Sequence, residues 1–394
     1  MLQSGPSKRG GNSACRRALL AGLLAVLPAA LFAQASLVRE GGRWVQTITG
    51  SAPAAARLRV LCQGPVHLEG GTANEIAYTA KVSVRARNEG EARRLLEGFG
   101  VRKSTSGEWA VLVAGGGKGT ASLTLRTPRL AGVLISTAEG GVEANGVEGF
   151  LTADTRAGEM KCDRIAGECR LTTGGGDILV GEIGGGLQSS TGGGRIVVKS
   201  VRGDAVLETA GGDIQVGDAG AAVRADTAGG AVRINSAGGS VTASTGGGPI
   251  VIGKAGGIVI TRNMAGPVQV GAATGVRSES GTGGIRLNNI AGPMRVSTAV
   301  GNIMATLLAG RPLLDSYLAT GDGDITVLIP SNVGVTVRAQ NDLADSLTRI
   351  VSDFPDLPVR MRGMQVVAEG AINGGGPLLR ISGTGGTIFI KRQR

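Results

Sequence analysis

The sequence is poor in the residue types from which most metal and catalytic sites are built. Its 394 residues include one histidine, four cysteines and only 2% aromatic residues. The single histidine, His67, excludes a site made of several histidine ligands. The scarcity of aromatic residues excludes a core of large rings and predicts a thin core of small aliphatic side chains. None of the aromatic residues lies between Thr155 and Thr298, so that stretch has no platform on which a sugar ring could stack.

Long apolar runs are also scarce. The longest is ALLAGLLAVLPAALF, at 18–32, and its fifteen residues fall short of the roughly 20 needed to span a membrane. It follows a basic stretch and precedes Ala33-Gln34-Ala35, which supplies the small residues of a cleavage site. This arrangement predicts a removable export signal over 1–35 and no transmembrane anchor after cleavage. Arg16-Arg17 leaves open whether export uses the general or the twin-arginine route.

Cleavage would leave three cysteines: Cys62, Cys162 and Cys169. Exported proteins meet oxidising conditions, and Cys162 and Cys169 are the natural pair for a disulfide. Cys62 is then expected to be a buried thiol within a strand. Cleavage would also lower the formal net charge from +11 to +7. The remaining basic residues are spread along the chain, which is typical of a solvated surface, although a basic surface can favour acidic polysaccharides or anionic membranes. Nucleic-acid binding is not expected, because basic residues neither cluster nor alternate with aromatic ones.

What the sequence has in abundance is glycine, 70 residues, and most of it belongs to a repeat of eighteen residues. Each unit has a threonine, a glycine three positions later, and apolar residues five and seven positions later. The threonines are Thr137, Thr155, Thr173, Thr191, Thr209, Thr227 and Thr245, and the register returns at Ser280, Thr298 and Thr320 after small shifts. A spacing kept for this many units indicates stacked structural repeats.

Each unit contains two strand patterns. Apolar residues alternate with variable ones, as at Ile196 and Val198 in one strand and Val223 and Ala225 in another, which is the period of a half-buried strand. Glycines separate the two strands of a unit. Units of equal length allow each strand to pair in register with its equivalent in the next unit. The sequence therefore predicts an all-β protein, a parallel β-helix or β-solenoid with eighteen-residue coils.

The glycine clusters are interpreted as corners of the coil. A corner of two or three residues needs positive φ and close backbone approach, and glycine permits both. A phosphate-binding loop would require a lysine and a following helix, whereas here every cluster leads into another strand. A ladder of calcium sites is not expected either, because the position of Asp177 becomes Arg195, Asp213, Ala231 and Pro249 in later units. The threonines are expected to point inward or along the edge, where their hydroxyls would satisfy backbone groups at the turns.

The flanking regions depart from the repeat. We expect a strand-rich N-terminal cap with one helix over 36–135, regular coils over 136–327, and irregular coils with a cap over 328–394. The expected strands of the flanks are 57–64, 76–87, 108–115, 121–128, 333–340, 365–370, 377–386 and 387–394, the helix is 89–99, and 341–358 is a polar excursion. Caps are needed because the ends of a solenoid expose unpaired strand edges.

The rungs of the form T-x-G-G-x-I-x-V and the terminal stretch INGGGPLLRISGTGGTIFIKR (372–392), together with the export signal, resemble the bacterial putative-adhesin family. This is a domain of unknown function found in cell-envelope proteins, and the resemblance covers roughly 40–394. It implies a β-solenoid located outside the cytoplasm, with adhesion as the expected role. The family has no agreed catalytic residues to transfer. Some relatives are anchored in the membrane, and this chain lacks the anchor helix.

Two functions follow as hypotheses. The first is a non-enzymatic envelope adhesin or scaffold without a cofactor, whose rigid face binds an envelope polymer, surface or protein. Its contact face would include Leu179, Val197, Arg233 and Val251, which point outward from the first strand of their units, unless the N-terminal segment covers them. The alternative is a β-helix enzyme that cleaves acidic polysaccharides. Its only close acidic pair within a unit is Asp322 and Asp324, which flank a corner glycine where aspartate commonly stabilises the turn.

Overall fold

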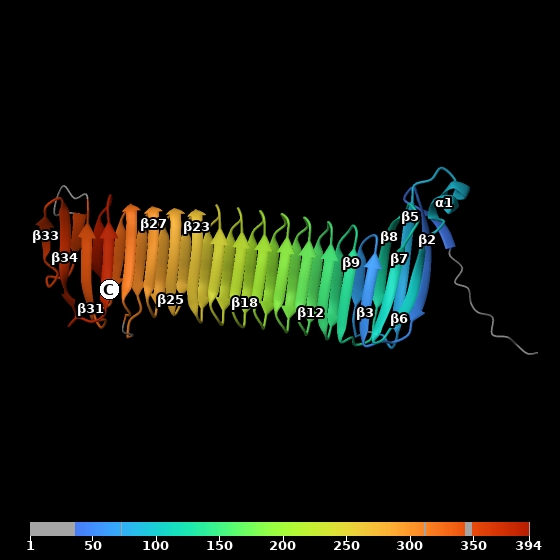
Figure 1. The fold of residues 1–394 in the computed structure, drawn as a ribbon, viewed down its shortest axis with the longest axis horizontal. Coiled ribbons are helices and arrows are strands. Elements are labelled where there is room, and N and C mark those ends of the chain that lie inside the picture. Colours follow the sequence, from blue (N-terminus) through green and yellow to red (C-terminus); the bar gives the residue numbers. More distant parts are fainter. Residues whose placement is uncertain (1–35, 72, 311–312, 343–348, 394) are drawn as a thin grey trace, which may run out of the picture. The chain divides into compact units, whose positions relative to one another are not determined.

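A computed structural model describes residues 36–71, 73–310, 313–342 and 349–393, so the expected export signal lies outside the described residues. The unit from Ala35 to Arg394 is a stack of β-coils with one helix, and it is drawn from blue to red in Figure 1. No helix within the described ranges is long and apolar enough to cross a membrane.

The central coils alternate between two sheets, so each turn of the chain contributes one strand to each. In sheet A the parallel strands stack in the order β10 (Val142–Val147), β12 (Met160–Ile165), β14 (Ile178–Ile183), β16 (Ile196–Val201), β18 (Ile214–Ala219), β20 (Val232–Ala237), β22 (Ile250–Ala255), β24 (Val268–Ala272), β26 (Ile285–Ile290), β28 (Ile303–Leu307) and β30 (Ile325–Ile329).

Sheet B is built in the same way from the second strand of each coil. Its central strands are β9 (Gly132–Thr137), β11 (Phe150–Thr155), β13 (Cys169–Thr173), β15 (Leu187–Thr191), β17 (Ala205–Thr209), β19 (Val223–Thr227), β21 (Val241–Thr245), β23 (Ile258–Ala265), β25 (Gly275–Thr282), β27 (Met294–Val300) and β29 (Ser316–Asp322). The expected β-solenoid with eighteen-residue coils is confirmed.

The register follows directly from the repeat. Ile196 pairs with Ile214 in sheet A and Thr191 pairs with Thr209 in sheet B, each eighteen positions apart. The alternating apolar residues of both sheets point into the space between them and are almost fully buried. Burial of each such side chain contributes about 1.5–3 kcal/mol. Two irregularities change the spacing: Thr261 of β23 pairs with Ser278, and Arg295 of β27 pairs with Tyr317.

The corner glycines meet the two expected requirements unevenly, since close backbone approach recurs along the coils and positive φ does not. Of the glycines three positions after the threonine or serine of each unit, Gly140, Gly158, Gly283, Gly301 and Gly323 have a positive φ, whereas the five from Gly176 to Gly248 do not. A Cβ on Gly194 would lie 2.1 Å from the carbonyl oxygen of Gly176 in the preceding coil. Glycine is therefore needed because successive corners stack backbone on backbone, leaving no room for a methyl group.

The N-terminal segment extends the stack and does not lie over its side. A coil made of β3 (Arg57–Cys62) and β4 (Val66–Glu69) pairs with β9 and β10 on one side. On its other side it pairs with β7 (Trp109–Gly115) and β8 (Thr120–Arg126), which come later in the sequence. The first coil is thus inserted between two later ones. The sequence did not predict β4 or this insertion.

Antiparallel strands close this end. Beyond β8 lie β5 (Ile76–Val84), β2 (Arg43–Ala52) and β1 (Ser36–Glu40) in sheet A, and beyond β7 lies β6 (Gly100–Ser106) in sheet B. Helix α1 (Glu89–Leu96) begins at Asn88, whose side chain accepts a hydrogen bond from Glu91 N–H (2.9 Å). The expected helix is confirmed, although it ends three residues early.

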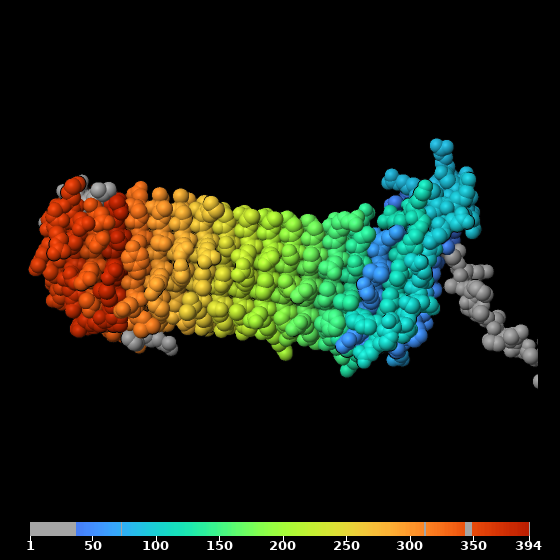
Figure 2. Space-filling model, in the orientation of Figure 1, coloured from blue at the N-terminus to red at the C-terminus, as the bar shows by residue number. Residues whose placement is uncertain are grey.

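The C-terminal end repeats the insertion. The last two strands, β35 (Leu378–Gly383) and β36 (Ile388–Arg392), fit between the coil of β29 and β30 and the coil of β31 (Val335–Asn341) and β32 (Ile350–Ser352). In Figure 2 the red C-terminal strip accordingly lies between two orange regions. Antiparallel strands β34 (Gln365–Ile372) and β33 (Val359–Arg362) complete sheet B. The expected polar excursion at 341–358 therefore includes a strand of sheet A, and 343–348 lie outside the described residues.

Candidate binding surfaces

The threonine column forms a ladder inside the corner. All seven threonines of the regular repeat are buried, as are Thr298 and Thr320. Each hydroxyl donates to the carbonyl of a corner glycine in the preceding coil, as from Thr191 Oγ1 to Gly176 O (2.8 Å) and from Thr209 Oγ1 to Gly194 O (2.8 Å). In five coils the hydroxyl also accepts a hydrogen bond from the glycine N–H three positions later. These hydroxyls are fully used by the backbone, which leaves them unsuited to bind a ligand.

Acidic residues near the corners have a comparable structural role. Asp177 Oδ1 accepts the Arg195 N–H of the next coil (3.0 Å), and its Oδ2 lies 2.7 Å from the Arg195 guanidinium. That backbone hydrogen bond, reinforced by the guanidinium, lowers the pKa of Asp177 below its usual range. Asp324 Oδ1 likewise accepts the Thr387 N–H (2.8 Å), so this member of the acidic pair considered for the enzymatic alternative binds backbone. Asp322 is exposed at the edge of the corner.

Cys162 and Cys169 meet in the core between the two sheets. Both are free thiols in the structure, as is Cys62, and all three are buried. The hydrogen bond to Cys169, together with burial, raises the pKa of Cys162 well above the usual range of a thiol. A disulfide between them is not formed in this structure and stays a prediction. Burial also raises the pKa of Cys62.

The expected contact face is an open row along the outside of sheet A. Leu179 pairs with Val197, and Arg233 pairs with Val251, so each pair occupies neighbouring strands. Arg233 is exposed and the other three are half-buried. The N-terminal segment does not cover the row, because its strands pair edge to edge with the end of the stack (Figure 1). The row is therefore accessible, and its role in binding stays a prediction.

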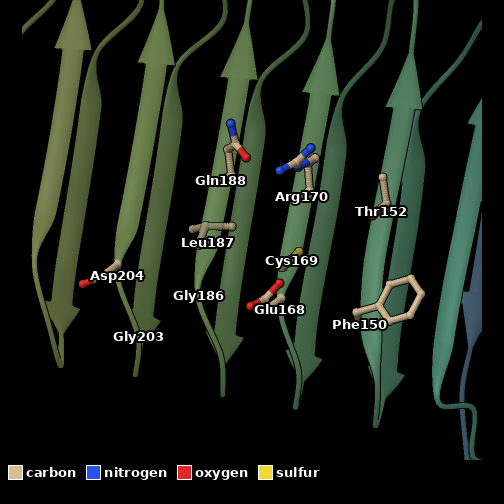
Figure 3. A pocket seen from close by; sticks show the side chains of 10 residues that line it. All are labelled: Phe150, Thr152, Glu168, Cys169, Arg170, Gly186, Leu187, Gln188, Gly203 and Asp204. Atoms are coloured by element: carbon tan, nitrogen blue, oxygen red, sulfur yellow. The ribbon is translucent and has the colours of Figure 1, made fainter.

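A second surface, which the sequence did not single out, is a shallow groove on the outside of sheet B. It has a volume of about 570 Å³. Thr152, Arg170 and Gln188 project from consecutive strands, while Glu168 and Asp204 lie nearer the corner (Figure 3). Thr152, Arg170 and Gln188 form one outward column, directly after the first inward-pointing residue of each strand, and Glu168 and Asp204 come directly before that residue. Inspection of these two columns of the repeat would have found them.

An aromatic cluster borders this groove. The rings of Trp109 and Phe150 are 6.4 Å apart in an edge-to-face arrangement, and the Arg57 guanidinium lies 5.6 Å from the centre of the Trp109 ring. The Phe150 ring lies over Gly132 of the neighbouring strand, where a side chain would collide with it. Phe150 therefore covers a backbone gap, and the groove itself is walled mostly by polar side chains.

The acidic residues of the groove lie at the outer surface of sheet B. Glu168 and Asp204 are exposed, and Asp204 Oδ1 is occupied by the Ala222 N–H (3.0 Å). Among the described residues there is also no group of three or more histidine, cysteine, aspartate or glutamate side chains placed to hold a metal ion.

Comparison with known proteins gives structural neighbours only. No family model and no curated protein matches the sequence. Solved structures with a similar arrangement include a putative cell adhesion protein from Clostridium sporogenes (9% identity, TM-score 0.20, covering 89% of this chain and 100% of that one). Others are putative adhesins from Bacteroides fragilis (10%, 0.23, 89% and 97%) and Parabacteroides merdae (10%, 0.27, 72% and 91%). The neighbours thus carry the same description as the family that the sequence resembles. TM-scores this low give no common superposition of whole chains, so the function of this chain has to be argued from its own residues.

Proposed function

We propose that this chain is a non-enzymatic, exported adhesin or scaffold of the cell envelope. The observation that carries the proposal is the in-register pairing of both sheets, which sets equivalent outward side chains in straight rows along two open faces. Such rows can contact a polymer or a flat surface at many points. Binding at many weak points gives avidity without any deep pocket.

The state of the acidic residues also supports binding over catalysis. Asp177, Asp204 and Asp324 each accept a backbone N–H from a neighbouring coil. These carboxylates hold successive coils together. The proposed location outside the cytoplasm rests on the export signal expected over 1–35.

The test is a co-sedimentation assay with bacterial envelope fractions. The purified chain beginning at Ser36 would be mixed with peptidoglycan, outer-membrane vesicles and extracted surface polysaccharide, each washed free of protein. We expect it to sediment with at least one fraction. A chain that stays in the supernatant with every fraction would rule the proposal out.

The enzymatic alternative makes the opposite prediction on the same materials. A lyase or hydrolase would release unsaturated products or reducing ends from acidic polysaccharides, and D324N would abolish that release. We expect no release from the wild-type chain, measured by absorbance of unsaturated uronates and by a reducing-end assay. Release that D324N abolishes would refute the non-enzymatic proposal.

A further inference from the structure

The outer face of sheet B changes character towards the C-terminal end. There, one residue from each of five neighbouring strands forms a single row, which we name the arginine–tyrosine row: Arg277, Arg295, Tyr317, Arg380 and Arg338, from β25, β27, β29, β35 and β31. All five side chains are exposed, and Tyr317 is 42% exposed. At about 4.8 Å per strand the row is about 19 Å long.

The charges of the row are balanced at its ends and unbalanced in its middle. Arg277 pairs with Glu279 (2.9 Å), and Arg338 pairs with Glu369. Arg295 and Arg380, which flank Tyr317, form no ion pair among the residues that the structure describes. The centre of the row thus presents two free guanidinium groups about 10 Å apart, two strand spacings, with an aromatic ring between them.

The surroundings leave this centre accessible. Two positions further along the same strands the side chains are small, namely Ser297, Ala319 and Ser382. The nearest acidic residue at the start of these strands, Asp315, already accepts the Leu378 N–H through Oδ1 (2.9 Å). A ligand that lies across the strands can therefore reach both guanidinium groups and the ring.

From this arrangement we propose that the arginine–tyrosine row binds an acidic polysaccharide whose carboxylates recur along an extended chain. A guanidinium group holds a carboxylate through two parallel hydrogen bonds, and the face of a tyrosine ring packs against the apolar face of a sugar. Carboxylates on every second sugar of an extended chain have a separation of the same order as the one between Arg295 and Arg380. A nucleic acid fits less well, because such ligands are held by longer sets of cations that neutralise successive phosphates.

This inference rests on the proposed adhesin function and names its ligand class. It also assigns a role to an insertion in the fold, since Arg380 reaches the row only because β35 lies between β29 and β31. The fit requires no covalent step and no cofactor.

The experiment measures binding to polygalacturonate, with dextran as the uncharged control and a single-stranded DNA oligonucleotide as the competing polyanion. The test variant is R295Q/R380Q. The matched control is R102Q/R156Q, which removes the same charge from two exposed arginines outside every candidate surface that form no ion pair among the described residues. Thermal melts would verify that both variants fold like the wild type.

We expect polygalacturonate to bind, salt to weaken the binding, and R295Q/R380Q to weaken it about tenfold, as two exposed charge pairs of ordinary strength would. R102Q/R156Q should bind like the wild type, and Y317A should bind more weakly than the wild type. No binding of polygalacturonate, an equal loss in both arginine variants, unchanged binding by Y317A, or tighter binding of DNA would each overturn the inference. If the envelope fractions still bind when polygalacturonate does not, only the ligand class is wrong; if no fraction binds, the proposed function itself fails.

Discussion

The stacked corners make a sharp prediction about two adjacent glycines. A Cβ on Gly212 would lie 2.1 Å from the carbonyl oxygen of Gly194 and 2.7 Å from the Arg195 nitrogen, whereas a Cβ on Gly211 would have no atom within 4 Å. Neither glycine has a left-handed φ, so backbone strain does not distinguish them. Substitution by alanine at the two positions therefore isolates the effect of close stacking.

We expect Gly212→Ala to destabilise the chain by about 3 kcal/mol. The methyl group forces two backbones apart by more than an ångström, and overpacking of this kind costs about 1–3 kcal/mol. The shift also weakens the bond from Thr227 Oγ1 to Gly212 O (2.9 Å), for which about 1 kcal/mol is a typical contribution. Gly211→Ala should be neutral or stabilise by about 0.4–1 kcal/mol, because it only restricts the unfolded chain.

Urea unfolding followed by circular dichroism would give the two stabilities, and hydrogen exchange would locate the change, since a repeat protein can unfold coil by coil. We expect faster exchange in the coils next to residue 212 only. Because both variants replace a glycine by alanine, the effect of alanine on the unfolded chain cancels when the two are compared. Equal stability of the two variants would refute the view that corner glycines serve close backbone approach.

Three further predictions concern single side chains. Thr191→Val should lower the free energy of unfolding by about 1–3 kcal/mol, because it leaves buried backbone groups without a hydrogen-bond partner. Thr242→Val, on the outer face, should change it by less than about 0.5 kcal/mol, and urea unfolding measures both. Asp177→Asn should lower the free energy of unfolding by about 0.5 kcal/mol at pH 7. Because the pKa of Asp177 is lowered in the folded chain, its stabilising effect is lost on protonation, and the two proteins should become equally stable as the pH falls below about 4. Thermal melts run from pH 7 to pH 2 measure this. Iodoacetamide should label Cys162 and Cys62 very slowly at pH 8 in the folded chain and rapidly in urea, because both are buried thiols with raised pKa; rapid labelling of folded protein, read by mass spectrometry, would contradict this.

The regular coils could be predicted because their information is local and repeated. An apolar residue such as Ile196 has its partner, Ile214, one period away, so the period alone determines the register. The same logic placed the threonines at the inner side of the corners. The reason for the glycines was half right, because the predicted close approach of the backbones is found along the coils, whereas the predicted positive φ is found at only some corners, such as Gly140 and Gly158.

The two ends could not be predicted, because their pairings are not periodic. Val60 pairs with Leu112 on one side and with Ile135 on the other, so both neighbours of the coil at β3 lie far along the chain, at unequal separations. No spacing in the sequence indicates which strand fills such a position. Strands β1, β2 and β6, which close the N-terminal end, and β4, which lies between β8 and β10, were missed for the same reason.

The candidate surfaces follow the same division. The row on sheet A was found from the sequence because Leu179 and Val197 are one period apart. The groove around Arg170 lies in an equally periodic column, but its mixed polar side chains do not distinguish a ligand site from a solvated surface. The arginine–tyrosine row had no such signal, since Tyr317 and Arg380 are 63 positions apart and become neighbours only through the inserted C-terminal strand.

The insertion at the C-terminal end links stability to the proposed binding row. Strands β35 and β36 pair on both of their edges, so their removal would expose four strand edges and leave the end strands without their parallel partners. The bond from Asn341 Nδ2 to Gly386 O (2.7 Å) continues the corner ladder across this junction with asparagine in place of threonine. The same coil supplies Arg380 to the row. A chain that failed to insert its last coil would therefore lose both the closed end and the spacing of the two free guanidinium groups, so that the binding row exists only in the fully assembled fold.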